Sequence, residues 1–186
     1  MEREVINKWL GRFGLGIAIL SLLEILTIII LGVTPLVING SMMTMHELIL
    51  VSGLFPVAGA LAWIFLLLII CGFLILGGFL IFIIKKKNIA LPYFAKYSIV
   101  IGMLLLIGAF NKMEYVHILQ RTTVDISPTA LSFQTILIDP DFTPFYVLIF
   151  WNFFSVVVCT YTVVALIIAA GGLNITLKFE RKELPK

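Results

Sequence analysis

Charged residues are scarce in this chain. Only 12% of its 186 residues are Asp, Glu, Lys or Arg, whereas charged residues make up about a quarter of a soluble domain. Hydrophobic residues make up 61%, and the mean hydropathy is +1.16. So few charged groups cannot cover a wet surface around one small core. The composition excludes an ordinary cytosolic enzyme, a nucleic-acid-binding domain and a disordered tail, and it predicts an integral protein of the lipid bilayer.

Cysteines and catalytic motifs are equally sparse. The two cysteines, Cys71 and Cys159, lie inside apolar runs, so neither a disulfide framework nor a four-thiolate zinc site is supported. The sequence contains no P-loop, GxGxxG, HExxH or GxSxG motif. These absences weigh against an enzyme but leave that question open.

Four apolar stretches are long enough to cross a bilayer, which takes roughly 20 helical residues. They do not alternate with period 2 in ten-residue segments, so they are expected to be helices rather than barrel strands. We therefore predict an all-α integral membrane protein: an up-down antiparallel bundle of four transmembrane helices forming one domain over residues 1–186, with no internal repeat. The predicted spans are residues 13–36, 60–84, 97–119 and 144–173.

Basic residues predict the orientation of these helices. Three lie before the first span, four between the second and third, and four in the tail, so eleven of the thirteen fall on one side. They are Arg3, Lys8 and Arg12; Lys85, Lys86, Lys87 and Lys96; and Lys178, Arg181, Lys182 and Lys186. Because lysine and arginine stay on the cytoplasmic side, both termini are predicted to be cytoplasmic and residues 37–59 and 120–143 to be outer loops. The expected membrane is the plasma membrane of a prokaryote.

The outer loops contain two apolar segments. Residues 48–59 precede the second span and include Pro56; they suit an interfacial segment, a re-entrant segment or an extension of the helix, and we favour an extension bent near Pro56. Residues 131–138 are apolar as well, and they are expected on the membrane surface or against the outer helix ends.

Polar residues inside the spans predict a buried cluster. Glu24 lies near the middle of the first span, where an ionised carboxylate must be neutralised or paired. Counted at 1.5 Å per residue, Lys112 lies at a similar depth, and Asn111 and Asn152 fall near it. The sequence therefore predicts a cluster of Glu24, Asn111, Lys112 and Asn152, serving as a structural ion pair, a binding pocket or a proton relay. The alternative is that Lys112 snorkels to the membrane surface while Glu24 stays protonated.

Both histidines fall at the predicted outer boundary. His46 is followed by Glu47, and Glu114 precedes His117 by three residues, which puts carboxylate and imidazole on one helical face. These four residues are a candidate metal site, and the two imidazoles are candidate axial ligands of a haem. The alternative is that they are interfacial residues that bind loops and lipid headgroups.

Small residues recur along one face of the fourth span. This face consists of Ser155, Cys159, Thr162, Ala165, Ala169 and Gly172. Small faces allow membrane helices to approach closely, so this one either packs inside the bundle or docks a partner subunit.

Three functions remain. The short loops and the small-residue face favour a small subunit or accessory protein of a larger membrane complex, packed against other subunits or copies of itself. An alternative is a metal- or haem-dependent membrane redox protein that uses the His/Glu cluster. A second alternative is a small oligomeric transporter or channel built around Glu24 and Lys112. The sequence identifies no substrate.

Overall fold

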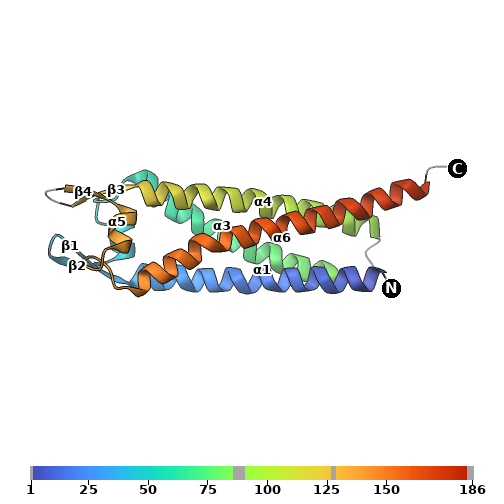
Figure 1. Cartoon of the computed structure of the whole chain (residues 1–186), viewed down its shortest axis with the longest axis horizontal. Helices are drawn as coiled ribbons and strands as arrows, with labels where there is room; N and C mark the ends of the chain where they lie inside the picture. Colours follow the sequence, from blue (N-terminus) through green and yellow to red (C-terminus); the bar gives the residue numbers. More distant parts are fainter. Residues whose placement is uncertain (1, 86–90, 127–128, 184–186) are drawn as a thin grey trace. The chain divides into compact units, whose positions relative to one another are not determined.

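Four long helices make up most of the chain. The computed structural model describes residues 2–85, 91–126 and 129–183. The long helices are α1 (Glu2–Val33), α3 (Val57–Lys85), α4 (Leu91–Arg121) and α6 (Tyr146–Glu183) (Figure 1). Each contains a stretch long and apolar enough to cross a membrane. By length and composition the chain is a helical multi-pass membrane protein, as predicted.

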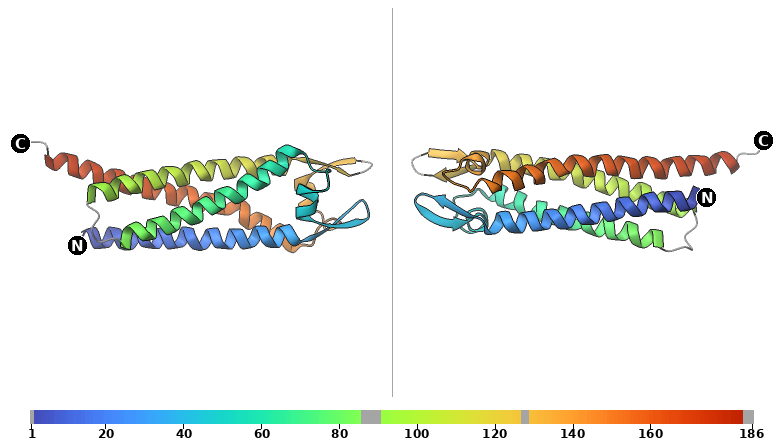
Figure 2. Two further views of the ribbon diagram at one scale, coloured as in Figure 1. Left: turned by 180° about the vertical axis from the view of Figure 1, so that it is seen from behind. Right: turned by 60° about the horizontal axis from the view of Figure 1, so that its bottom comes forward.

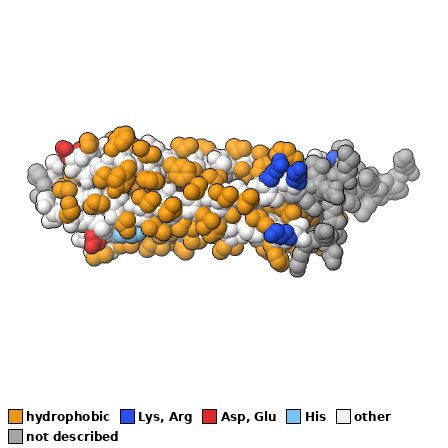
Figure 3. Space-filling model, turned by 90° about the horizontal axis from the view of Figure 1, so that it is seen from below, with side chains coloured by type: hydrophobic (Ala, Val, Ile, Leu, Met, Phe, Trp, Pro, Cys, Tyr) orange, Lys and Arg blue, Asp and Glu red, His pale blue; other side chains and the backbone are white. Residues whose placement is uncertain are grey.

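Large apolar side chains are exposed along all four long helices. On the face drawn in Figure 3, hydrophobic side chains cover much of the described surface. Water would make such a surface unfavourable, whereas hydrocarbon does not. The outward faces therefore suit contact with lipid.

Each connection from α1 to α3 and from α4 to α6 contains a β-hairpin and a short helix. The first comprises β1 (Pro35–Ile38), β2 (Ser41–Thr44) and α2 (Met45–Leu50). The second comprises β3 (Thr123–Ile126), β4 (Thr129–Ser132) and α5 (Phe133–Ile138). Both hairpins are antiparallel (Figure 2). Ile38 pairs with Ser41 in the first hairpin, and Ile126 pairs with Thr129 at the equivalent place in the second.

The hairpins were not predicted from the sequence. Asn39 and Gly40 both have positive φ, 52° and 72°, which is the backbone of a two-residue type I′ turn, and Asn-Gly is the dipeptide that favours it. Four-residue strands are too short to stand out beside long apolar runs, so the turn dipeptide is the stronger indication.

The predicted extension of the second span around Pro56 is wrong. Helix α2 ends at Leu50, residues 51–56 are not helical, and α3 begins at Val57. Gly53 adopts φ +71°, a left-handed conformation that interrupts the helix. The carbonyl of Pro56 accepts hydrogen bonds from the amides of Gly59 and Ala60, so this proline starts a helix instead of bending one.

The order of elements occurs twice. Thr34 and Thr122 each follow a long helix, and each is followed by a four-residue strand, a second four-residue strand that begins after two further residues, and a six-residue helix. Equivalent strands of the two hairpins share one burial pattern: exposed and buried residues alternate in β1 and β3, and two exposed residues precede two half-buried ones in β2 and β4. No internal repeat is predicted from the sequence, whereas the structure contains one at the level of its elements.

The chain divides into two compact units, each built from parts of all four long helices. Unit 1 comprises residues 1–22, 71–110 and 159–186, and unit 2 comprises residues 23–70 and 111–158. Both hairpins belong to unit 2, where α1 and α4 end and α3 and α6 begin. Consecutive long helices therefore enter and leave unit 2 in opposite directions, as an up-down order requires.

Unit 1 is held by close helix contacts at small residues. A Cβ on Gly14 would lie 3.1 Å from the carbonyl oxygen of Gly77, and one on Gly102 would lie 2.8 Å from that of Ala165. The rings of Phe73 and Tyr161 are in contact, with centroids 4.3 Å apart and planes tilted by 34°. Because at least one of the two helices has glycine at each crossing point, α1 approaches α3 and α4 approaches α6 to backbone contact.

The small-residue face of α6 is only partly used in this packing. Ala165 and Ala169 lie against Gly102, and Gly172 lies against Ala95, whereas Cys159 is exposed. The mean spacing along this face is shorter than 3.6 residues, so its direction turns by about 100° from end to end. One end therefore packs on α4 and the other points elsewhere.

Unit 2 contains one apolar core that joins the helix ends to the short helices. Phe133 of α5 contacts both Phe55 and Trp151 edge to face. Ile136 and Leu137 of α5 and Leu48 of α2 are buried in the same core. The apolar segment 131–138 thus packs against the helix ends, which was one of its two predicted positions.

Candidate functional site

An ion pair is buried in unit 2. The ammonium of Lys112 on α4 donates a hydrogen bond to a carboxylate oxygen of Glu24 on α1, and both side chains are fully buried. The same ammonium donates to the backbone carbonyl of Phe154, at 2.9 Å, and lies 4.3 Å from the centre of its ring. Carboxylate, carbonyl and aromatic face together replace the water that the ammonium has lost.

The helical period brings the two charges inward. Glu24 lies one turn from Ser21 and Ile28 on the buried face of α1. Lys112 lies one turn from Ala109 and Val116 on the buried face of α4. Residues three and four apart share a helical face. The helix orientation that buries Ile28, or Ala109 and Val116, therefore also points the charged side chain on the same face inward.

The structure does not bring the two asparagines to this pair. Asn111 and Asn152 are both exposed, which departs from the predicted four-residue cluster. Successive side chains on a helix point about 100° apart, so Asn111 faces away when Lys112 faces inward. Asn152 is displaced by two positions from Phe154 and also lies on another face. Depth along a helix axis does not determine the direction in which a side chain points.

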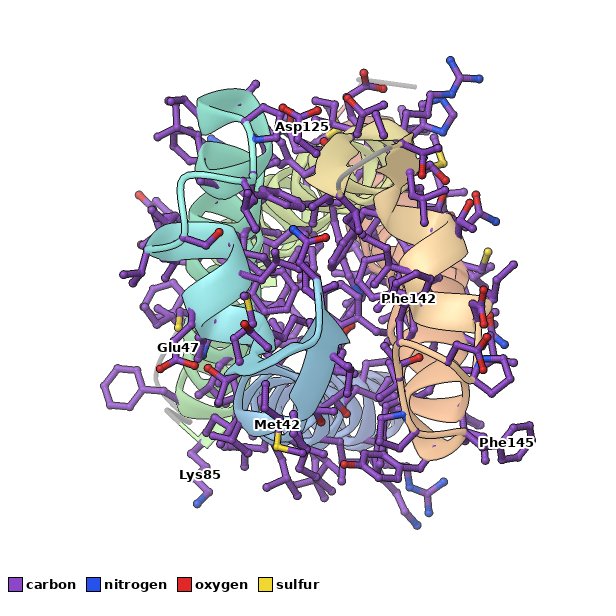
Figure 4. All side chains as sticks on the ribbon, turned by 90° about the vertical axis from the view of Figure 1, so that its left-hand side faces the viewer. Met42, Glu47, Lys85, Asp125, Phe142 and Phe145 are labelled. Atoms are coloured by element: carbon purple, nitrogen blue, oxygen red, sulfur yellow. The ribbon has the colours of Figure 1, made fainter. Side chains whose placement is uncertain are left out.

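The four predicted metal ligands are not gathered into one site. His46 is half-buried, with its ring against Gly32 and edge to face with Trp63 at 6.0 Å. Glu47, Glu114 and His117 are exposed. Figure 4 places Glu47 and a further carboxylate, Asp125, at different edges of unit 2. Within the described residues no group of three His, Cys, Asp or Glu side chains could hold a metal ion.

Glu47 has a local structural role. Its carboxylate accepts hydrogen bonds from the amide and the hydroxyl of Thr44, at 2.7 and 2.9 Å, and its own amide donates to that hydroxyl. This reciprocal arrangement is a capping box at the start of α2. The hydrogen bonds from the Thr44 amide, and then from its hydroxyl, lower the pKa of the Glu47 carboxyl.

Acidification is expected to weaken the start of α2. Because the pKa of Glu47 is lower in the folded protein than in the unfolded chain, its contribution is present above the unfolded value, 4.5, and is lost as pH falls through the folded value. Hydrogen exchange of the α2 amides, corrected for intrinsic rates, should speed up at low pH, and Glu47→Gln should remove that pH dependence.

Helix α5 is the internal control for this titration. Its N-cap is Ser132, whose hydroxyl accepts from the amide of Thr135, and no carboxylate takes part. Protection of α5 should therefore stay constant over the same pH range. Equal loss of protection in α2 and α5 would show that the unit opens as a whole and that the cap is not responsible.

Two buried tryptophans were not predicted as related residues. Trp63 and Trp151 are almost fully buried, and within the part of the chain that the structure describes neither indole N–H has a hydrogen-bond partner. A buried indole usually finds one. Their surroundings, Pro56 before one and Pro144 before the other at equal spacing, recur in the sequence and are the pattern that would have revealed them.

No family model, no curated protein and no solved structure matches this chain. Among the described residues, the pair of Glu24 and Lys112 is the candidate site with the most defined geometry.

Proposed function

We propose that this protein is a small multi-pass subunit or accessory protein of a larger membrane complex, acting through packing and without a catalytic centre of its own. The observation that carries the proposal is the buried pair: Lys112 binds Glu24, the Phe154 carbonyl and the Phe154 ring. Charges bound to one another inside the fold suit a role in holding helices together. The outward apolar faces are then the surfaces for lipid and partner helices.

The distribution of charge supports an orientation for this subunit. The described basic side chains of unit 1 are Lys8, Arg12, Lys85, Lys96 and Lys178. The described part of unit 2 has only two basic side chains, Lys112 and Arg121, and it also contains the carboxylates from Glu24 to Asp141. By the positive-inside rule, we propose that both termini face the cytoplasm and that residues 37–59 and 120–143 lie outside, in the plasma membrane of a prokaryotic cell.

Purification from native membrane tests the proposal. A tagged chain extracted in mild detergent is expected to bring down one or more other membrane proteins in fixed ratio, identified by mass spectrometry. The matched control is an unrelated tagged four-helix membrane protein expressed at the same level. Purification as a single species with an activity of its own would contradict the proposal, and an absorption spectrum of the same sample would reveal a bound chromophore.

A transporter is the second candidate, and the same pair favours it. Ionisable side chains inside membrane-spanning helices often mark a path for ions or protons, and Glu24 and Lys112 are both fully buried. In proteoliposomes, a transporter would lose flux with Glu24→Gln even where the variant remains folded. If the function survives this substitution and only thermal stability falls, the pair is structural.

A further inference from the structure

We infer that this chain is a tandem duplication of one two-helix module. In this arrangement, the opposite charges of Glu24 and Lys112 favour pairing of the first module with the second over pairing of either module with a second copy of itself. The first module covers the described residues 2–85 and the second covers residues 91–173. Each contains a long helix, a hairpin, a short helix and a second long helix.

The first support is the register of the elements. The first strands begin at Pro35 and Thr123, and the short helices at Met45 and Phe133; each is the same distance apart as Glu24 and Lys112, 88 residues. The boundaries between units 1 and 2 also recur at this distance. Independent insertions and deletions would have destroyed such a register, so a single offset without gaps points to a copied segment.

The second support is the residues themselves. At the 88-residue offset the same amino acid recurs at positions with a structural role. These pairs include Gly14 and Gly102, Leu31 and Leu119, Thr34 and Thr122, Pro56 and Pro144, Trp63 and Trp151, and Cys71 and Cys159. Each glycine lies at a helix crossing and each proline just before a long helix, while both tryptophans are buried in unit 2.

The third support is packing inside each module. Gly14 meets the backbone of Gly77, and Gly102 meets the backbone of Ala165. Gly77 and Ala165 are again 88 residues apart. The same pair of positions therefore makes the helix crossing in both modules.

Contacts between the modules join equivalent positions. Glu24 meets Lys112 in unit 2, and Phe73 meets Tyr161 in unit 1, each pair separated by 88 residues. A residue contacts its own equivalent only near a two-fold axis, as in a symmetric dimer. Within each unit, the two modules thus pack around a local pseudo-two-fold axis.

The charges at these equivalent positions determine the pairing. Two copies of the first module would bury Glu24 against a second glutamate, and two copies of the second would bury Lys112 against a second lysine. Two like charges that are buried together repel each other, which is strongly unfavourable. In the mixed arrangement, the carboxylate of Glu24 and the ammonium of Lys112 bind each other instead. An acid in one module and a base in the other therefore select the mixed arrangement.

Exchanging the equivalent residues in the full chain tests this inference. Lys112→Glu or Glu24→Lys alone creates a like-charged pair and is expected to raise the unfolding equilibrium constant about 100-fold or more. The double exchange E24K/K112E should return it to within about tenfold of the parent. The relocated ammonium then meets position 66, the equivalent of Phe154, so adding L66F/F154L should recover stability further.

A second exchange tests the inference in unit 1 without changing any charge. Tyr161 shares a hydrogen bond with Ser21, at 3.1 Å, and the equivalents of these residues are Phe73 and Ala109. The exchange F73Y/Y161F/S21A/A109S should fold with near-parental stability, whereas S21A/A109S alone should not recover the lost hydrogen bond.

The outcomes separate duplication from coincidence. Double exchanges that restore stability in both units support the pseudo-two-fold. If E24K/K112E is no more stable than either single variant, or fails to fold where the neutral pair E24Q/K112M folds, positions 24 and 112 are not equivalent and the inference is wrong. If F73Y/Y161F/S21A/A109S does not fold while each of its single variants folds, the inference is also wrong, whatever the result for positions 24 and 112.

Discussion

Glu24→Gln is expected to lower the free energy of unfolding by about 3 kcal/mol, at the lower end of what breaking a buried ion pair costs. The substitution preserves shape and removes the negative charge, which leaves the ammonium of Lys112 buried with the Phe154 carbonyl and ring. Lys112→Met, which leaves the carboxylate buried, should cost a similar amount. Reversible unfolding in mixed detergent micelles, followed by tryptophan fluorescence, measures both.

The double variant E24Q/K112M is the control for this prediction. When both charges are removed, neither remains uncompensated, and the loss should fall to about 1 kcal/mol. The coupling energy of this cycle then reports the interaction itself. Two single effects that simply add would show that Glu24 and Lys112 act independently, contrary to the contact between them.

Gly77→Leu is the second substitution with a large expected effect. A Cβ on Gly77 would lie 2.9 Å from the amide nitrogen of Ala18 and 2.9 Å from the carbonyl oxygen of Gly14. These are backbone atoms that cannot rotate away, so α1 and α3 have to separate. Overpacking of this kind costs about 3 kcal/mol, and it should appear as a lower unfolding temperature of the purified protein.

The adjacent glycine is a matched control. A Cβ on Gly78 would meet nothing within 4 Å, and leucine is the better helix former, so Gly78→Leu should be neutral or slightly stabilising. Gly172 and Gly171 form a second such pair, since a Cβ on Gly172 would lie 2.7 Å from the carbonyl of Ala95 and one on Gly171 meets nothing. Equal effects at both members of a pair would show that helix propensity, not contact, determines the outcome.

Part of the candidate site follows from arithmetic along the chain. A lone glutamate and a lone lysine inside apolar helices need partners, and counting 1.5 Å per residue from the helix ends puts Glu24 and Lys112 at similar depth. Depth along a helix carries no information about rotation around its axis. Depth alone therefore predicts Asn111 beside Lys112, although neighbouring side chains on a helix point in different directions and Asn111 is exposed.

The two hairpins could not be predicted from the hydropathy of the sequence, for a different reason. Long apolar spans dominate the hydropathy of this chain, so eight strand residues in each connection leave little trace in it. Asn39-Gly40 was the local indication of the first turn. The duplication was equally readable, because Pro56, Trp63 and Cys71 recur in the same order and spacing. It was missed because apolar residues substitute freely for one another and hide the identities.

Composition and the lengths of the apolar runs were sufficient to predict four helices long and apolar enough to cross a membrane, because a backbone in hydrocarbon has to satisfy its hydrogen bonds within each segment. Which residues meet inside the bundle was decided only by the tertiary structure. Helix rotation, close approach at glycines and the pairing of equivalent modules depend on contacts between segments distant in the chain, and such contacts leave no periodic pattern within any one of them.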